Sequence, residues 1–173
     1  MDNFIPDMYQ KSIYHINYDK LKEDGIKCLL FDLDNTCVPF KDKEPNKKLV
    51  DLFEELKDMD FKVIIFSNAT KKRLTPFKNG LNVDCSASSK KPSSKKLLKV
   101  IKMFNYDLSD VAIIGDQLYT DVLGGNKVGI KTILVNPMSK DDMLFTKMFR
   151  FLEKNKFKKF AKKGILIKGK YYE

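Results

Sequence analysis

The stretch that decides the fold is residues 28–36, which read CLLFDLDNT. Four apolar residues followed at once by polar ones are typical of a strand buried on both faces of a parallel sheet. Alternate side chains of a strand share a face, so Asp32 and Asp34 can project together, with Cα atoms roughly 6.6 Å apart. Two such carboxylates repel each other, and a divalent cation or a shared proton would relieve that cost. A plain strand end with a turn fits the pattern equally well, so the rest of the chain has to decide.

Strand-like and helix-like segments alternate along the chain. The predicted strands are residues 28–32, 62–66, 82–85, 111–115 and 131–135, and the predicted helices are 18–24, 45–60, 70–79, 93–105 and 119–127. This alternation predicts an α/β, Rossmann-like fold: a parallel sheet with helices on both faces. Residues 1–17 are expected to wrap the core as an arm, and residues 165–167 to form a terminal strand.

Polar side chains follow three of these strands at the point where each strand ends. They are Asp32 and Asp34 after the first strand, Ser67 and Asn68 after the second, and Asp116 after 111–115. In an open α/β sheet, ligands bind outside the carboxyl ends of the strands. The sequence therefore predicts a site at this edge.

The charge of the chain is strongly positive and unevenly distributed. Its 173 residues carry a formal charge of +10, and residues 138–173 hold eleven Lys/Arg against four Asp/Glu. Such a balance favours an anionic partner: nucleic acid, an anionic membrane or a phosphorylated substrate. We predict one domain over residues 1–140, of which 1–25 are the arm and short helix, and a basic extension over 141–173.

Several classes of protein are not indicated. The N-terminus lacks the pattern of a signal peptide, and no stretch is apolar enough to span a bilayer. The three cysteines have no CxxC spacing, which argues against a zinc site or disulfides and favours a reducing cytoplasm. Since His15 is the only histidine, catalysis would have to use carboxylates and lysines.

The polar residues at the strand ends resemble, in order, the four motifs of the haloacid dehalogenase (HAD) superfamily of phosphotransferases. The first motif, DxDxT, is matched by 32–36. The second is matched by Ser67, the third by Lys91 with Lys90 as the competing choice, and the fourth by Asp116 and Asp121.

This resemblance implies a role for each matched residue. Asp32 would attack phosphorus and form an aspartyl-phosphate, while Asp34 would act as general acid and base. Mg²⁺ would be held by Asp32, Asp116 and the main-chain carbonyl of Asp34. The phosphoryl oxygens would be bound by Ser67, Asn68 and Lys91, with Thr36 and Asp121 in supporting positions.

No large cap domain fits between the motifs. Only 30 residues separate Thr36 from Ser67, and 23 separate Ser67 from Lys91. Each interval is filled by a single crossover, as in capless, class III members of the superfamily. The resemblance thus implies an open site, which suits phosphates on large or surface-bound substrates.

A narrower resemblance is carried by residues 4–7, 32–36 and 115–126, which are similar to the YqeG-type HAD phosphatases. That group is similar to phosphatidylglycerophosphatases, so a phosphatidylglycerophosphate substrate at the inner face of the membrane is implied. Cys37 stands where family members commonly have Leu. Two alternatives remain open: a capless phosphatase for a nucleic-acid end, phosphoprotein or small metabolite, and a basic nucleic-acid-binding protein on a HAD scaffold.

The basic extension has a helical pattern of its own. Residues 143–163 place Phe, Leu and Met among lysines, as in helices that lie in the interface of anionic membranes. The same pattern fits a helix that packs on the sheet with a solvated lysine face, and both can hold together. RNA binding is a third interpretation, although no recognisable RNA-binding module is present.

Overall fold

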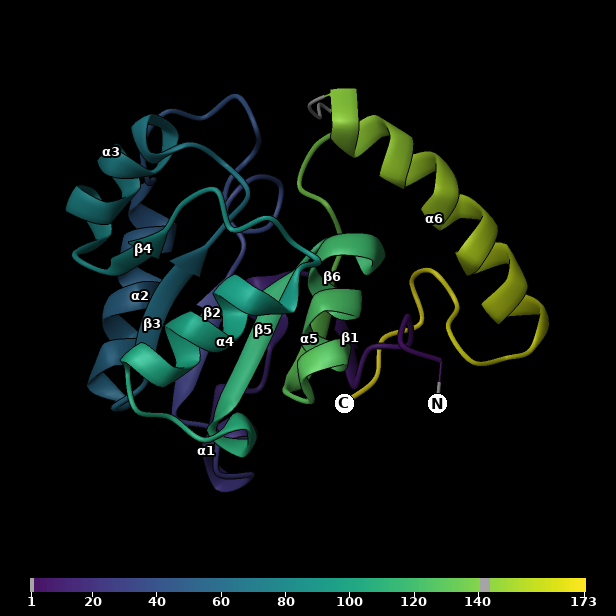
Figure 1. The fold of residues 1–173 in the computed structure, drawn as a ribbon, viewed down its shortest axis with the longest axis horizontal. Helices are drawn as coiled ribbons and strands as arrows, with labels where there is room; N and C mark the ends of the chain where they lie inside the picture. The colour runs from purple at the N-terminus through teal and green to yellow at the C-terminus, as the bar shows by residue number, and fades with distance from the viewer. Residues whose placement is uncertain (1, 141–143) are drawn as a thin grey trace.

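Six parallel strands form the centre of the molecule, in the order β1-β6-β5-β2-β3-β4 (Figure 1). The strands are β1 (Met8–Gln10), β2 (Cys28–Phe31), β3 (Lys62–Phe66), β4 (Asp84–Ser86), β5 (Val111–Gly115) and β6 (Lys131–Val135). The computed structural model describes residues 2–140 and 144–173. The predicted parallel sheet is confirmed, and β2 lies at its middle, between β5 and β3.

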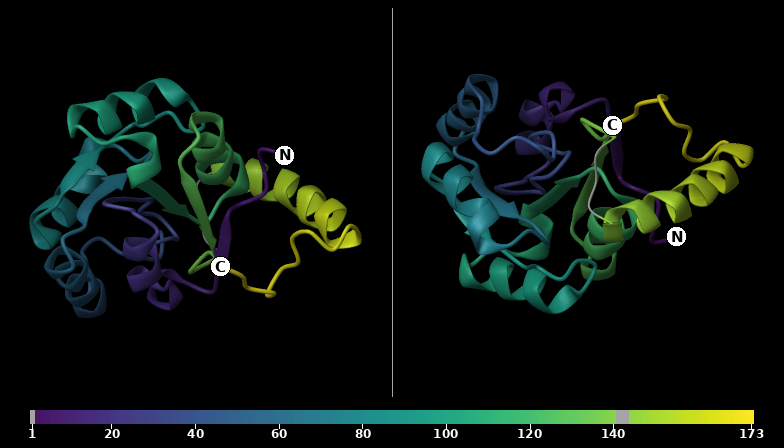
Figure 2. Two further views of the ribbon diagram at one scale, coloured as in Figure 1. Left: turned by 90° about the horizontal axis from the view of Figure 1, so that it is seen from below. Right: turned by 90° about the horizontal axis from the view of Figure 1, so that it is seen from above.

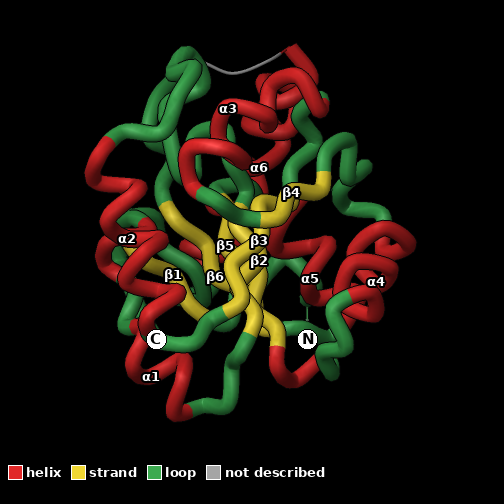
Figure 3. The backbone as a smooth tube through the Cα atoms, turned by 90° about the vertical axis from the view of Figure 1, so that its left-hand side faces the viewer, coloured by secondary structure: helices red, strands yellow, loops and turns green. Residues whose placement is uncertain are grey.

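Helices cover both faces of the sheet (Figure 3). They are α1 (Tyr18–Glu23), α2 (Lys47–Asp58), α3 (Lys71–Leu81), α4 (Ser94–Met103), α5 (Leu123–Val128) and α6 (Leu144–Lys162), with 3₁₀ turns at Ile13–His15 and Leu108–Asp110 and a π-helical turn at Leu118–Val122. Helices α1, α2 and α3 pack on one face, and α4 packs on the other. Within residues 37–66 and 68–90 no cap domain is inserted, as predicted.

The alternation of apolar residues explains how one strand serves two cores. Leu29 and Phe31 of β2 face the α1–α3 side, whereas Cys28 and Leu30 face the α4 side. Fully burying such side chains contributes roughly 1.5–3 kcal/mol each for Leu or Phe. A strand buried on both faces therefore has little freedom to slip, which fixes where Asp32 emerges.

The two ends of the chain depart from the prediction: the arm contains a strand that was not predicted, and the strand predicted at residues 165–167 does not form. The N-terminal arm contributes an edge strand, β1, which pairs with β6 at Met8↔Ile133. A strand of three residues is too short to show a period of two, so residues 8–10 could not be recognised as a strand from their pattern. Residues 165–167 form no strand, because Gly164 and Gly169 adopt positive φ on either side and turn the chain. Tyr172 instead forms an isolated antiparallel bridge with Tyr9.

Helix α6 lies beyond the β1 edge of the sheet in both views of Figure 2. Phe160 of α6 and Leu166 are buried against Tyr9, Leu118 and Leu134 in a third apolar cluster. The helix thus packs on the core, one of the two arrangements left open above. The predicted boundary at residue 140 stays a prediction, and the side chains of Leu144 and Phe145 lie outside the described part. None of the described helices is both long and apolar enough to cross a bilayer.

Candidate active site

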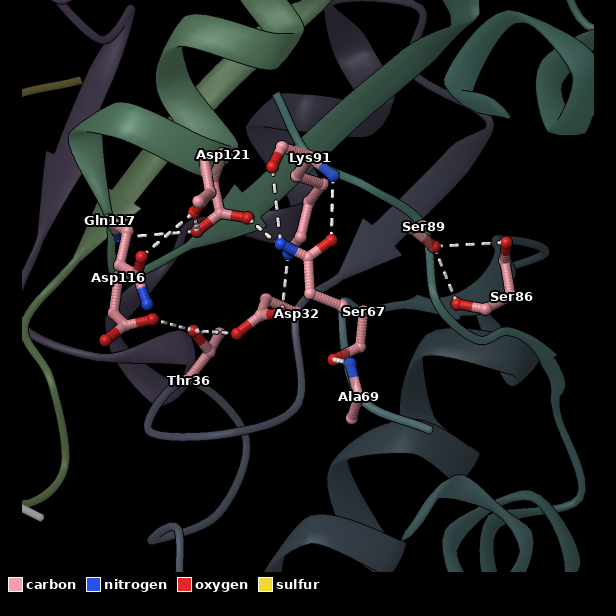
Figure 4. A network of polar contacts seen from close by, with 12 residues as sticks. Asp32, Thr36, Ser67, Ala69, Ser86, Ser89, Lys91, Asp116, Gln117 and Asp121 are labelled. Atoms are coloured by element: carbon pink, nitrogen blue, oxygen red, sulfur yellow. Dashed lines mark hydrogen bonds and ion pairs between the residues drawn. The ribbon is translucent and has the colours of Figure 1, made fainter. Parts of the chain in front are cut away.

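The predicted site residues meet at the carboxyl ends of the central strands (Figure 4). Asp32 follows β2, Asp116 follows β5 and Ser67 follows β3. The main-chain N–H of Asp32 donates to the carbonyl of Ile114 at 2.9 Å, so the sheet ladder continues into the site. The sheet therefore fixes the position of Asp32 along the strand direction relative to Asp116 and Ser67 on the neighbouring strands.

Three carboxylates form a buried cluster. Asp32, Asp116 and Asp121 each offer an oxygen, and these oxygens lie within 4.8 Å of one another. Asp121 reaches the cluster because the π-helical turn places it beside Gly115, where an added Cβ would overlap the Asp121 carboxyl group. Only glycine fits at that position. Carboxylate oxygens so close together suit a hard divalent cation. Asp121 belongs to the same cluster as Asp32 and Asp116, the two carboxylates predicted to bind the metal.

Lys91 is the cation at the centre of the cluster. Its Nζ donates to Asp32 Oδ1 at 2.5 Å and to Asp121 Oδ1 at 2.6 Å. Burial would lower the pKa of Lys91, but the carboxylates of Asp121 and Asp32 outweigh it and raise the pKa. Lys91 is therefore charged and buried, whereas the competing Lys90 is exposed.

The loop that carries Lys91 is tied to the end of β3. The Asn68 side chain accepts from the main-chain N–H of Lys91 at 2.7 Å and donates to its carbonyl at 3.3 Å. The Ser67 carbonyl accepts from the N–H of Ser89 at 3.0 Å. Asn68 thus positions the lysine, while Ser67 Oγ accepts from the N–H of Ala69 at 3.2 Å, a bond that does not use its own O–H.

Asp34 occupies a different environment, beside Arg73 of α3. Arg73 Nη2 and Nε donate to Asp34 Oδ1 at 2.7 and 3.1 Å. Burial nevertheless raises the pKa of Asp34, and Arg73 only partly offsets it. A raised pKa suits a carboxyl that must give up and take back a proton. Arg73 also donates to the carbonyls of Phe40 and Asp42, which fixes the loop after β2.

Asp116 is held from two sides. Thr36 Oγ1 donates to Asp116 Oδ1 at 2.9 Å, and Arg150 of α6 donates to its other carboxylate oxygen and, at 2.8 Å, to its carbonyl. Glu153 accepts from Arg150 at 3.3 Å and from the N–H of Leu118 at 2.5 Å. Burial raises the pKa of Asp116 to about 7, although Arg150 acts in the opposite direction. The C-terminal helix is therefore bonded directly to the carboxylate cluster.

Three residues of the site, Arg73, Arg150 and Glu153, are not among those predicted from the sequence. A signal for the first two exists, since among 33 Lys and Arg residues only these two are Arg. The rigid guanidinium fork binds carboxylates in a way that lysine cannot reproduce. In a chain that otherwise uses lysine, an arginine is therefore a candidate for binding a carboxylate, as Arg73 binds Asp34 and Arg150 binds Asp116. Glu153, the acidic residue of α6, shows no comparable signal.

We expect Mg²⁺ to stabilise the protein more at pH 8 than at pH 6. Between about pH 4 and 7 the folded protein holds a proton on Asp116 that the unfolded chain has lost, so metal-free stability falls as pH rises, and the full cost is present above pH 7. Binding of a divalent cation such as Mg²⁺ would offset that cost. At saturating Mg²⁺ and pH 8 the melting temperature should rise by about 5–10 °C, with a smaller rise at pH 6. Equal shifts at both pH values, or the same shift with NaCl at matched ionic strength, would contradict this.

Several known proteins are similar to this chain. A family model described as HAD-hydrolase-like matches residues 89–141. The chain is 37% identical over 161 residues to "Probable phosphatase YqeG" of Bacillus subtilis, covering 93% of this chain and 94% of that one. It is 26% identical to "Phosphatidylglycerophosphate phosphatase 1, chloroplastic/mitochondrial" of Arabidopsis thaliana, covering 93% of this chain but 49% of the longer protein.

The fold is also found among solved structures. The cobalt-bound deoxy-D-mannose-octulosonate 8-phosphate phosphatase of Haemophilus influenzae superposes with a TM-score of 0.53 at 16% identity. The match covers 67% of this chain and 81% of that one. At this identity the likeness concerns the fold alone.

Proposed function

Because the chain belongs to the YqeG family of HAD phosphatases, we propose that it hydrolyses a phosphate monoester of an anionic phospholipid with Mg²⁺ as cofactor. The observation that carries the chemistry is the buried cluster of Asp32, Asp116 and Asp121 around Lys91. Burying these charged groups costs folding free energy, and binding of a charged ligand would offset that cost. The proposed lipid is phosphatidylglycerophosphate.

The first chemical step uses the two aspartates of residues 32–36. A carboxylate oxygen of Asp32 attacks phosphorus, and the bond from phosphorus to the leaving oxygen breaks. Asp34, whose pKa burial raises, gives its proton to that oxygen, so the alcohol leaves neutral. Asp34 then takes a proton from a water molecule, which attacks the aspartyl-phosphate and releases inorganic phosphate. Asp32 returns as a carboxylate.

Other groups hold the charge that develops on phosphorus. A bound Mg²⁺ would neutralise phosphoryl charge and would be held by Asp32, Asp116 and the carbonyl of Asp34, with Asp121 also within reach. Lys91 and the O–H of Ser67 would bind phosphoryl oxygens. Asn68 acts through its bonds to the main chain of Lys91. Thr36 and Arg150 orient the carboxylate of Asp116.

The substrate proposal is supported by the Arabidopsis relative, whose name specifies phosphatidylglycerophosphate, and by the absence of a cap between residues 37 and 90. It is tested by measuring phosphate release from phosphatidylglycerophosphate in mixed micelles, in Mg²⁺ and in EDTA. A soluble aryl phosphate and a sugar phosphate are assayed in parallel. Release from the soluble esters without release from the lipid would overturn the lipid assignment and leave the phosphatase.

Peripheral membrane contact is proposed from the surface of α6. Met148 and Phe151 are 53% and 66% exposed. Lys159, Lys162 and Lys163 are exposed at the other end of the helix and beyond it. Exposed apolar side chains together with lysines are the features by which a helix binds an anionic bilayer surface.

Changing Lys159, Lys162 and Lys163 together to Gln should weaken sedimentation with phosphatidylglycerol-containing vesicles. Each lysine near an anionic surface contributes about 1 kcal/mol, so the partition coefficient should fall on the order of 100-fold. The matched control changes three exposed lysines of α4, Lys95, Lys99 and Lys102, to Gln. Deleting α6 is unsuitable, because Glu153 and Phe160 are buried. Equal losses in both variants would refute a membrane role for this part of the chain.

A further inference from the structure

A groove of about 310 Å³ adjoins the carboxylate cluster, between α6 and the β1–β6 edge of the sheet. Its apolar lining includes Leu134 and Val135 of β6 and Phe157 of α6. Asp116 and Arg150 also line it. Since Asp116 belongs to the same cluster as Asp32, the groove begins beside the reaction centre.

The charges around the groove favour an anion. Lys154 and Lys158, one turn apart on α6, line it together with Lys168 of the C-terminal segment, which turns back from α6 toward β1 (Figure 1). All three lysines are exposed, and none has an ion pair among the described residues. The acidic residues of the lining, Asp116 and Glu153, are both bound by Arg150. The groove therefore keeps an excess of positive charge next to an apolar wall.

We propose that this groove binds the leaving-group part of the substrate and that Lys154, Lys158 and Lys168 recognise a second anionic phosphate in it. The inference rests on the proposed function and adds to it the residues that select the substrate. The occupant is the head group of a phospholipid that carries a phosphomonoester and a phosphodiester. The monoester lies at Asp32, the diester pairs with the lysines, and the start of the acyl chains contacts Phe157 and the β6 side chains. A volume of 310 Å³ is at the lower end of small-molecule sites, which suits a head group rather than a whole lipid.

The test uses soluble substrates, so that membrane binding does not enter. They are p-nitrophenyl phosphate, the deacylated head group glycerophosphoglycerol phosphate, and dihexanoyl phosphatidylglycerophosphate below its micellar concentration. In the double variant Lys154→Gln/Lys158→Gln, and in Lys168→Gln, kcat/KM for the two diester-bearing esters should fall about tenfold relative to that for the aryl phosphate, mainly through KM. The matched control is Lys99→Gln/Lys102→Gln on α4.

Each outcome has a definite meaning. A selective rise in KM for both diester-bearing esters, with the dihexanoyl lipid preferred over the head group, supports anion recognition beside an apolar wall. Equal kcat/KM values for the dihexanoyl lipid and the deacylated head group would contradict the proposed contact between the acyl chains and the apolar wall. If kcat/KM falls equally for the aryl phosphate, or does not fall for any substrate, the proposed role of the groove is overturned. The proposed function is kept in that case as long as the lipid is hydrolysed. If wild type cleaves the aryl phosphate but neither diester-bearing ester, the groove proposal and the lipid assignment both fail, and the phosphatase assignment remains. The melting temperature of each variant excludes unfolding as the cause.

Discussion

Asp32→Asn is expected to lower phosphate release at least about 1,000-fold, because the amide cannot act as the nucleophile and no other carboxylate takes its place at the end of β2. The substitution keeps the shape of the side chain, and Asp121 still pairs with Lys91 at 2.6 Å. Removing one of three crowded carboxylates also lowers their mutual repulsion. The melting temperature should therefore change little while activity is lost. The measurement is phosphate release under saturating Mg²⁺ from the lipid and from an aryl phosphate.

The matched control for this variant is Asp58→Asn, an exposed aspartate at the end of α2. It removes the same charge at a surface position and should retain wild-type rates. Residual activity of Asp32→Asn within tenfold of wild type would rule out an aspartyl-phosphate at this position. The mechanism would then have to use direct attack by water.

Lys91→Met should damage both activity and stability, the second large effect. It leaves Asp32 and Asp121 buried without the cation that pairs with both, and breaking a buried pair by removing one partner costs about 3–5 kcal/mol. The rate should fall on the order of 100- to 1,000-fold, since a group that stabilises phosphoryl charge is lost. Thermal unfolding without metal and phosphate release with Mg²⁺ measure the two effects. Added Mg²⁺ should recover part of the stability, because it supplies positive charge to the same carboxylates.

Lys90→Met is the control, because it removes the same charge from the neighbouring residue. Lys90 is exposed, and its positive φ of 54° is a property of the backbone that Met must also adopt. Its variant should keep wild-type rates. If Lys90→Met loses activity and Lys91→Met does not, the assignment of the third motif is reversed.

Local patterns determined five of the six strands in the described sheet, most helices and the order of the site residues. Consecutive apolar residues such as 111–115 indicate a strand that is buried on both faces of a sheet. Parallel strands have their carboxyl ends at the same edge of the sheet. That is why Asp32, Ser67 and Asp116 could be brought together from the sequence. The pattern of residues 45–60 likewise predicted α2, which begins at Lys47 with the Asn46 side chain accepting from the N–H of Leu49 at 2.9 Å.

Only the tertiary structure decided which basic side chains pair with the carboxylates of the site. Lys90 and Lys91 are indistinguishable by composition, and the bonds from Asn68 and Ser67 to the loop turn Lys91 inward. The pairs Arg73–Asp34 and Arg150–Asp116 join residues 39 and 34 positions apart, and no local period encodes them. The short strand β1 forms because β6 offers an edge to pair with. Strand and helix periods arise from neighbouring residues, whereas these contacts depend on where whole elements pack. The sequence by itself therefore determined the parallel sheet, apart from β1, and the polar residues at its edge, and the packing of α3, α6 and the Lys91 loop decided how those residues are held.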